Sequence, residues 1–236
     1  MEGKIVILIT GQKNRLELLS KIKYIYTPLS KKYDVTMVLS LSETDNFTNK
    51  NKYKKTFHYD LCEINKELDT ISYYINDIVY PKLKINDELV SMYDKKWRGK
   101  KYTKQRAQNH VRQYYTLSNS WSIIKKLNPD ILIRIRDDAC LSTSLKLTKL
   151  HEVTSHPIKC IITPHKNRWG GINYKFAIVS KEAIETYLNK PLEEYNSYKI
   201  LIEKKIKNPE QFYQYVYANN GLSLLFSDIN INILGQ

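Results

Sequence analysis

Two arginines and two adjacent aspartates stand at the end of a short apolar segment, and together these residue types can bind a metal ion and a phosphate group. Ile131–Ile135 predicts a buried strand, and Arg134, Arg136, Asp137 and Asp138 lie within or directly after its last residues. Burying such charges costs free energy unless they pair with one another or with a ligand. In open α/β sheets, ligands bind just beyond the carboxyl ends of the strands. Because carboxylates suit a hard divalent cation and arginines suit phosphate, the segment indicates a metal–diphosphate site.

The alternation of a strand sorts these four charged residues. It places Arg134, Arg136 and Asp138 on one face and Asp137 on the other. One arginine could neutralise one aspartate as a structural pair, but two of each exceed what such a pair needs. We therefore predict that Asp138, with Asp137, binds Mn²⁺ or Mg²⁺ against a diphosphate, and that the metal neutralises charge developing on a leaving nucleotide.

A second candidate site lies at the first turn of the chain, Thr10 to Arg15, between a predicted strand and a predicted helix. Gly11 lets the backbone approach a ligand, the amides of the helix favour an anion, and Arg15 can bind a phosphate with two N–H groups. The turn lacks the glycines and spacing of a dinucleotide-binding fingerprint or a P-loop. An ordinary turn is the alternative.

The elements that must position these residues alternate between strand and helix. Pro28 is expected to end the first helix, and Asn208-Pro209-Glu210 has the cap, proline and acid of a helix start. The alternation predicts an α/β fold with a mostly parallel sheet. The predicted strands are Lys4–Thr10, Asp34–Leu41, 131–136, Lys159–Thr163, Asn173–Ser180 and Leu222–Phe226, and the predicted helices are Arg15–Tyr26, Thr103–Leu127, about 143–153, Lys181–Leu188, Leu192–Ile206 and 208–219.

Length and composition exclude several classes of protein. The 236 residues fit a single domain, no apolar run is long enough to span a bilayer, and the N-terminus does not resemble a signal peptide. Three scattered cysteines lack metal spacing, so we expect a cytoplasmic protein. The net charge of +14 allows nucleic acid, an anionic surface or anionic small substrates as partners. Because the excess is mostly dispersed lysine, a solvated surface is favoured and no nucleic-acid partner is expected.

Three separated segments resemble GT-A-type glycosyltransferase domains of bacterial surface-polysaccharide clusters and large DNA viruses. Thr10–Gln12 with Arg15 resembles the first-strand turn of that family. Residues 133–138 resemble its R-x-R-x-D strand, which replaces the usual DxD metal motif and aligns Asp138 with the family aspartate. Residues 169–187 resemble a third family segment, and 208–210 a later one, so the match covers nearly the whole chain.

Two residues depart from the family pattern. Tyr174 stands where the family often has aspartate, which weakens the assignment of a base in that loop. Asp137 stands where proline is common, which adds a second carboxylate and favours a metal.

The resemblance implies a Rossmann-like GT-A domain, with a nucleotide-sugar-binding half at about 1–140 and an acceptor-side half at about 141–236. It implies transfer of a sugar from a nucleoside diphosphate sugar, most simply UDP-linked, to a glycan hydroxyl. Residues assigned to the nucleotide sugar are Thr10, Gly11, Gln12, Arg15, Arg112, Arg134 and Arg136, and those assigned to the acceptor side are Trp169, Gly170, Gly171, Asn173 and Glu210.

Several of these assignments have a structural alternative. Trp169 either stacks on a sugar or packs in the core, and His165 is either a catalytic base or metal ligand or merely structural. Glu210 could contact an acceptor hydroxyl, but complementing the helix dipole is the favoured role. Arg112 either reaches the nucleotide or faces solvent. The basic segment Lys95–Arg106 permits stacking of bases or forms a loop over the site.

Two other classes of function stay open. A nucleic-acid-binding protein or metal-dependent nuclease would use the same carboxylates and the basic surface, and would show steeply salt-dependent binding. A glycan-binding module without activity would bind sugar but not transfer it.

Overall fold

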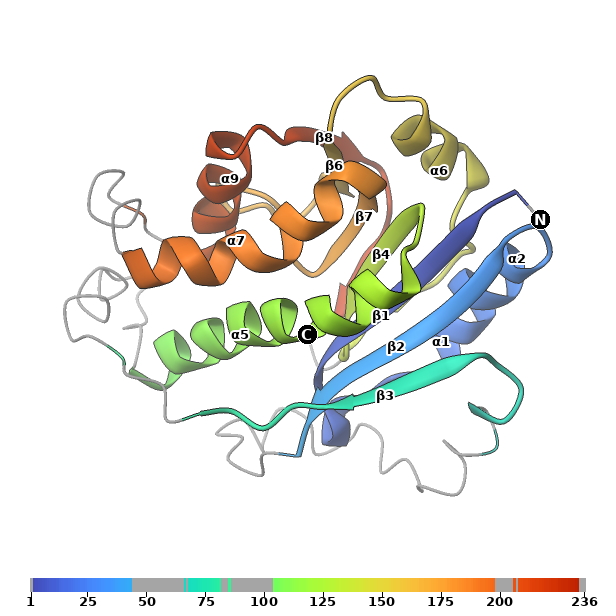
Figure 1. Cartoon of the computed structure of the whole chain (residues 1–236), viewed down its shortest axis with the longest axis horizontal. Coiled ribbons are helices and arrows are strands. Elements are labelled where there is room, and N and C mark those ends of the chain that lie inside the picture. The colour runs from blue at the N-terminus through green and yellow to red at the C-terminus, as the bar shows by residue number, and fades with distance from the viewer. Residues whose placement is uncertain are drawn as a thin grey trace.

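The computed structural model describes residues 2–43, 66, 68–81, 85, 104–197, 206 and 208–233. Its centre is a seven-stranded sheet with the order β3-β2-β1-β4-β7-β6-β8 (Figure 1). Only β7 runs antiparallel to its neighbours in this sheet, so the predicted mostly parallel α/β fold is confirmed. The strands are β1 Lys4–Gln12, β2 Asp34–Ser42, β3 Tyr73–Asp77, β4 Ile131–Arg136, β6 Cys160–Pro164, β7 Phe176–Ser180 and β8 Ser223–Ser227, and a separate pair is β5 Ala139–Leu141 with β9 Ile231–Ile233.

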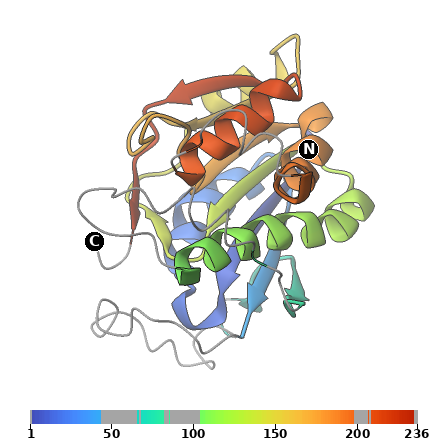
Figure 2. The same ribbon diagram turned by 90° about the vertical axis from the view of Figure 1, so that its left-hand side faces the viewer.

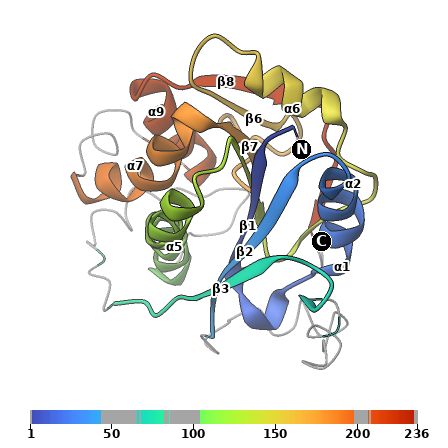
Figure 3. The same cartoon turned by 45° about the vertical axis from the view of Figure 1, so that its right-hand side comes forward.

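Helices cover both faces of the sheet (Figures 2 and 3). On one face lie α5 (Lys104–Leu127), α7 (Ile184–Ser197) and α9 (Pro209–Asn219). On the other lie α1 (Leu19–Lys21) and α2 (Thr27–Ser30), which a π-helical turn, η2 (Ile22–Tyr26), joins, together with α6 (Leu147–Thr154). Short 3₁₀ turns, η1 (Lys13–Arg15) and η3 (Lys181–Ala183), follow β1 and β7.

The central strand β1 is buried on both faces. Val6 and Leu8 belong to the apolar cluster under α5, α7 and α9, whereas Ile5, Ile7 and Ile9 belong to the cluster on the opposite face. All five side chains are fully buried. This explains why the strand is a continuous apolar run and not an alternating one.

The helix predicted at Arg15–Tyr26 differs from the structure. Leu16 to Leu18 are not helical, and the helical segment continues through Pro28 to Ser30, so the expected stop at this proline is wrong. The π-turn gives the reason. The Thr27 amide donates to the Ile22 carbonyl in this turn. Pro28 has no N–H to donate to the Tyr24 carbonyl one turn earlier, and that carbonyl accepts from the Leu145 amide instead, at 2.9 Å.

The two helices predicted at 181–188 and 192–206 are one continuous helix up to Ser197, with Pro191 inside it. The proline removes the N–H that would bond the Tyr187 carbonyl. The Tyr217 hydroxyl of α9 donates to that carbonyl instead, at 3.1 Å. A partner from another helix thus replaces the lost bond. Residues 198–205, and the predicted cap Thr103, lie outside the described part of the chain.

A buried lysine fixes the turn that joins β4 to β5. The Lys21 Nζ donates to the carbonyls of Asp137 at 3.0 Å, Ala139 at 2.6 Å and Glu17, and lies 3.3 Å from the Glu17 carboxylate. Burial lowers the pKa of Lys21, and the nearby Glu17 and Asp137 carboxylates oppose that shift. The Lys21 ammonium therefore stabilises, from inside the protein, the turn that carries Asp137 and Asp138, the predicted metal ligands.

Replacing this lysine tests its structural role. Lys21→Met keeps the length of the side chain but leaves three buried carbonyls and Glu17 without their donor, so we expect a loss of about 3–5 kcal/mol in unfolding free energy. Urea denaturation measures the loss. The control is Lys31→Met at an exposed position, with an expected change within about 0.5 kcal/mol. Equal unfolding midpoints for the two variants would contradict the assignment.

Candidate active site

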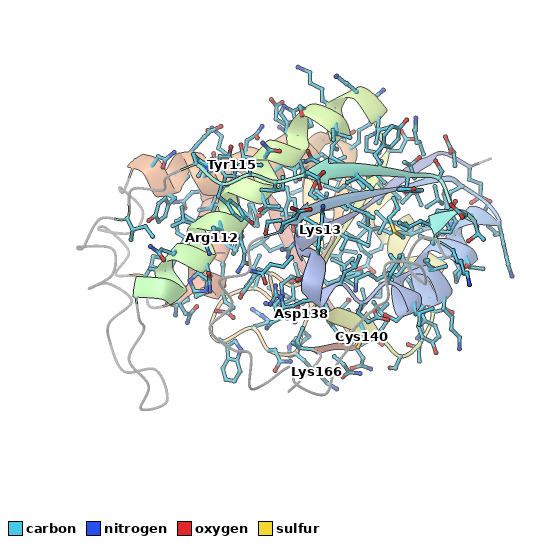
Figure 4. All side chains as sticks on the ribbon, turned by 90° about the horizontal axis from the view of Figure 1, so that it is seen from below. Lys13, Arg112, Tyr115, Asp138, Cys140 and Lys166 are labelled. Atoms are coloured by element: carbon cyan, nitrogen blue, oxygen red, sulfur yellow. The ribbon has the colours of Figure 1, made fainter. Side chains whose placement is uncertain are left out.

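The carboxyl ends of β1 and β4 lie side by side and bring the two candidate segments together. Thr10 pairs with Arg136 at the end of the ladder, and the Asp137 amide donates to the Thr10 carbonyl at 2.9 Å. Figure 4 looks onto this edge of the sheet. It shows Asp138 and Lys13 near the middle, with Arg112 of α5 to one side and Cys140 and Lys166 to the other.

Gly11 is required by the aspartate beside it. Its φ of +148° is a conformation that other residues rarely adopt, and a Cβ there would lie 2.1 Å from the Asp137 carboxyl carbon. The Gln12 amide donates to Asp137 Oδ2 at 2.9 Å. The glycine thus lets Asp137, the residue directly after β4, approach the turn that follows β1.

Two arginines neutralise the two aspartates. Arg15 lies 2.7 Å from Asp137 Oδ2 and 3.3 Å from Asp138 Oδ2. Arg136 binds Asp138 with two N–H groups, Nε and Nη2, both at 2.5 Å. Asp137 and Asp138 are fully buried, whereas the Arg15 and Arg136 side chains keep 15% and 14% of their surface exposed. The aspartates therefore lie fully inside the protein, and only the arginines of this cluster are partly exposed.

The pKa values of the two aspartates move in opposite directions. Burial would raise the pKa of Asp138, but the guanidinium of Arg136, with Arg15 and Lys21, holds it well below its usual range. For Asp137 burial prevails over Arg15, and the adjacent Asp138 also raises its pKa. Two adjacent buried carboxylates are tolerated at neutral pH only because cations surround them.

A divalent cation at these carboxylates would need free oxygens. All four carboxylate oxygens of Asp137 and Asp138 already accept hydrogen bonds, from Arg15, Arg136 and the Gln12 amide. In the described part of the chain, no three His, Cys, Asp or Glu side chains converge as a ligand set. In this arrangement the carboxylates do not fit a cation, because two guanidinium groups stand where it would bind.

The two arginines of β4 have different surroundings. Arg134 is 1% exposed and donates from Nε to Thr10 Oγ1 at 3.0 Å and from Nη1 to the Tyr174 carbonyl. It ties β1 to the loop before β7 and lies inside the protein. Arg136, at the end of the strand, is the arginine that reaches the surface.

The predicted acceptor-side loop is built together with the start of α9. A Cβ on Gly171 would lie 2.1 Å from the Glu210 carbonyl, and the Ile172 amide donates to that carbonyl at 3.1 Å. Asn208 caps the helix by accepting from the Gln211 amide, and donates to the Trp169 carbonyl at 3.0 Å. The helix start predicted at Asn208 is therefore confirmed, and it fixes the loop.

The remaining predicted residues lie in different places. Trp169 is partly buried with φ +48°, Gly170 is exposed with φ +79°, and Asn173 is buried, bracing the loop through the Lys166 carbonyl and the Lys175 amide. The His165 side chain is exposed.

Arg112 lies on α5. Its guanidinium lies 5.4 Å from the Tyr80 ring centre. Among the described residues, no hydrogen bond or ion pair joins His165 or Arg112 to the aspartate–arginine cluster.

Three charged residues of this site were not predicted from the sequence: Glu17, Lys21 and Lys175. Lys21 gave a usable signal, because it lies on the face of Leu18 and Ile25, where an apolar residue is expected. Lys175 gave none, since its burial against Arg136 and Glu210 depends on the tertiary structure.

Comparison with known proteins places the fold. No protein-family model and no characterised protein sequence matches this chain. Among solved structures, a mannosyltransferase from Pyrobaculum calidifontis, in complex with GDP-Man and Mn²⁺, matches 96% of the chain at 9% identity with a TM-score of 0.50. The chain has the fold of a GT-A glycosyltransferase domain. It spans 55% of the length of that mannosyltransferase.

A second solved structure is a glycosyltransferase involved in glycosylation of the major capsid of the virus PBCV-1. It matches 95% of this chain, and 82% of its own chain is covered, at 13% identity with a TM-score of 0.44. No helix within the described ranges is long and apolar enough to cross a membrane.

Gly11 provides a test of how the site is held. In Gly11→Ala the new methyl group must displace Asp137 in a backbone conformation that disfavours alanine, so we expect a loss of about 3 kcal/mol in unfolding free energy. Gly221→Ala is the matched control, because its φ is +75° but a Cβ there meets nothing within 4 Å. It should cost only about 1 kcal/mol. Equal losses in urea denaturation would show that Asp137 does not require the glycine.

Proposed function

We propose that the protein is a glycosyltransferase that moves a sugar from a nucleoside diphosphate sugar to a glycan hydroxyl. One observation carries the proposal. At the carboxyl edge of β1 and β4 in a GT-A sheet, Arg15 and Arg136 reach the surface while their aspartate partners are fully buried. A diphosphate is the anion that two adjacent guanidinium groups bind well, since a guanidinium carries five N–H donors and a bidentate bond to a carboxylate uses only two of them.

The polar atoms next to these arginines support a nucleotide. Gln12 is 8% exposed, and its Oε1 accepts no hydrogen bond within the described part of the chain. A ligand hydroxyl or N–H would supply the missing donor. UDP-sugars are the donors we propose first, and GDP-mannose second, because the Pyrobaculum mannosyltransferase of the same fold binds GDP-Man.

The predicted need for Mn²⁺ or Mg²⁺ is a separate part of the proposal. It is supported by the Mn²⁺ in the mannosyltransferase complex. In this chain a cation reaches Asp138 only where Arg136 or Arg15 leaves the carboxylate. A diphosphate would attract these guanidinium groups, so we expect the cation to bind with the nucleotide and not to the protein alone.

A melting experiment with nucleotides and nucleotide sugars tests donor binding. At a ligand concentration about 100 times Kd, the donor should stabilise the protein by about 2.7 kcal/mol and raise its Tm. Arg15→Gln removes charge-assisted bonds worth about 1.5–3 kcal/mol, so it should weaken donor binding about 10- to 100-fold. Lys32→Gln, at an exposed position paired with Glu2, is the control and should bind as the parent does.

The outcome of this panel also separates the proposed function from its alternative. If no nucleotide sugar raises the Tm and the protein instead retains DNA or RNA at physiological salt, the nucleic-acid interpretation replaces the transferase.

Asp138 is tested by nucleotide release from the donor that the panel selects. Asp138→Ala leaves Arg136 without its bidentate partner, and we expect release to fall at least about 100-fold. Asp130→Ala is the control, since Asp130 precedes β4 at the opposite end of the strand and pairs with Lys181. Undiminished, metal-independent release in Asp138→Ala would contradict the assignment. Mn²⁺ without nucleotide should leave the Tm of the parent protein unchanged.

A further inference from the structure

Glu210 is a buried carboxyl group in a position where acidic residues are ordinarily exposed. It is the second residue of α9 and is only 7% exposed. An acid that merely complements the helix dipole stays in water and keeps a low pKa. Burial instead raises the pKa of Glu210 to about 7, against the opposing effects of its own backbone amide, Lys175 and Arg136.

The main chain at Glu210 is held in one place. Gly171 packs against its carbonyl so closely that no other residue fits there, and the Ile172 amide donates to the same carbonyl. The cap residue Asn208 ties the helix start to the Trp169 carbonyl. A group fixed by a loop and a helix start together is preorganised, as a catalytic group must be.

Glu210 also adjoins the proposed donor site. Lys175, from the loop before β7, and Arg136, from the end of β4, lower the pKa of Glu210 through their positive charge, and Glu210 in turn raises the pKa of the buried Tyr174. Arg136 is the same guanidinium that binds Asp138, and its amide donates to the Lys175 carbonyl at 3.0 Å. The Tyr174 ring stacks on Tyr213, one turn after Glu210, with 5.4 Å between the ring centres, so the loop that bonds Arg136 packs against the start of α9. Glu210 therefore lies within electrostatic reach of the arginine that would hold the diphosphate, and it comes from the acceptor-side elements.

Among the carboxylates around this cluster, Glu210 is the one that stays available. Asp137 and Asp138 pair with arginines, and Glu17 pairs with Lys21. Glu210 forms no ion pair within 4.0 Å with any residue that the structure describes. Leaving a buried acid unpaired costs stability, and glutamine would fill the same space without that cost. A function in proton transfer accounts for the acid.

We propose that Glu210 is the general base that removes the proton from the acceptor hydroxyl, and that transfer inverts the configuration at the anomeric carbon. This inference rests on the proposed function. The acceptor O–H gives its proton to a Glu210 oxygen while the hydroxyl oxygen forms a bond to the anomeric carbon. The bond from that carbon to the diphosphate oxygen breaks, its electron pair leaves on the nucleotide, and Glu210 later releases the proton to water.

The protonation of Glu210 gives the reaction a definite pH dependence. A base works only when ionised, so the rate should rise as the pH passes through about 7 and level off above it. Stability should change in the opposite direction. Because folding raises the pKa of this acid from 4.5 to about 7, the folded state loses stability as the pH rises through that window.

The experiment compares the parent protein with Glu210→Gln, using the nucleotide sugar that gives the largest melting shift. Nucleotide release to water or a methyl glycoside should fall about 10²- to 10⁴-fold and lose its rise near pH 7. Donor binding should be unchanged. Azide ion needs no deprotonation, so it should restore nucleotide release in the variant and yield a glycosyl azide of inverted configuration. Glu185→Gln, an exposed acid in the first turn of α7, should keep the parent rate and pH profile.

Each outcome bears on one of the two proposals. Unchanged release and pH profile in Glu210→Gln, with donor binding intact, would overturn the role of Glu210 and leave the transferase standing. A glycosyl azide of retained configuration would overturn it too. If no nucleotide sugar binds, both proposals fall together. Melting curves of Glu210→Gln between pH 5 and about 7.5 check folding independently, because its Tm should rise relative to the parent across that interval.

Discussion

The pairing of two buried, adjacent aspartates with Arg15 and Arg136 is the interaction on which the rest of this site depends. Neighbouring carboxylates without water repel each other and lose their hydration, so either they take up protons or cations surround them. Here the chain supplies the cations from separate elements, the turn after β1 and the end of β4. The close approach at Gly11 and the lysine under the turn follow from the same requirement.

This pairing also decides what the edge of the sheet presents to a ligand. The aspartate side chains are fully buried, whereas the Arg15 and Arg136 side chains keep 15% and 14% of their surface exposed. The part of this cluster that a ligand can contact therefore belongs to the arginines, although the four charges together sum to zero. The Gly171 loop packs against the start of α9, and this part of the chain meets the end of β4 where the Arg136 amide donates to the Lys175 carbonyl.

The sequence predicted the features that local chemistry determines. The apolar runs of β1, β2 and β4, the long helix α5 and the Asn208 cap follow from hydrophobicity and capping. The helix through Pro191 could not be predicted, since the hydroxyl that compensates for the proline comes from Tyr217 on another helix. The sequence also did not determine which group binds Asp138. The residue pattern allows a metal or an arginine, and only the tertiary structure brings Arg15 to it.

The packing of Tyr174 against α9 explains why a tyrosine fits at this position. Where the resembling family often has aspartate, this chain has a tyrosine whose ring stacks on Tyr213 at 5.4 Å. Tyr213 lies three residues after Glu210, on the same face of the helix. An aspartate at 174 would be a buried carboxylate against this aromatic surface. The chain instead packs a ring there and places its acidic group one turn earlier on α9. Tyr174 and Glu210 therefore lie on the same side of the start of α9.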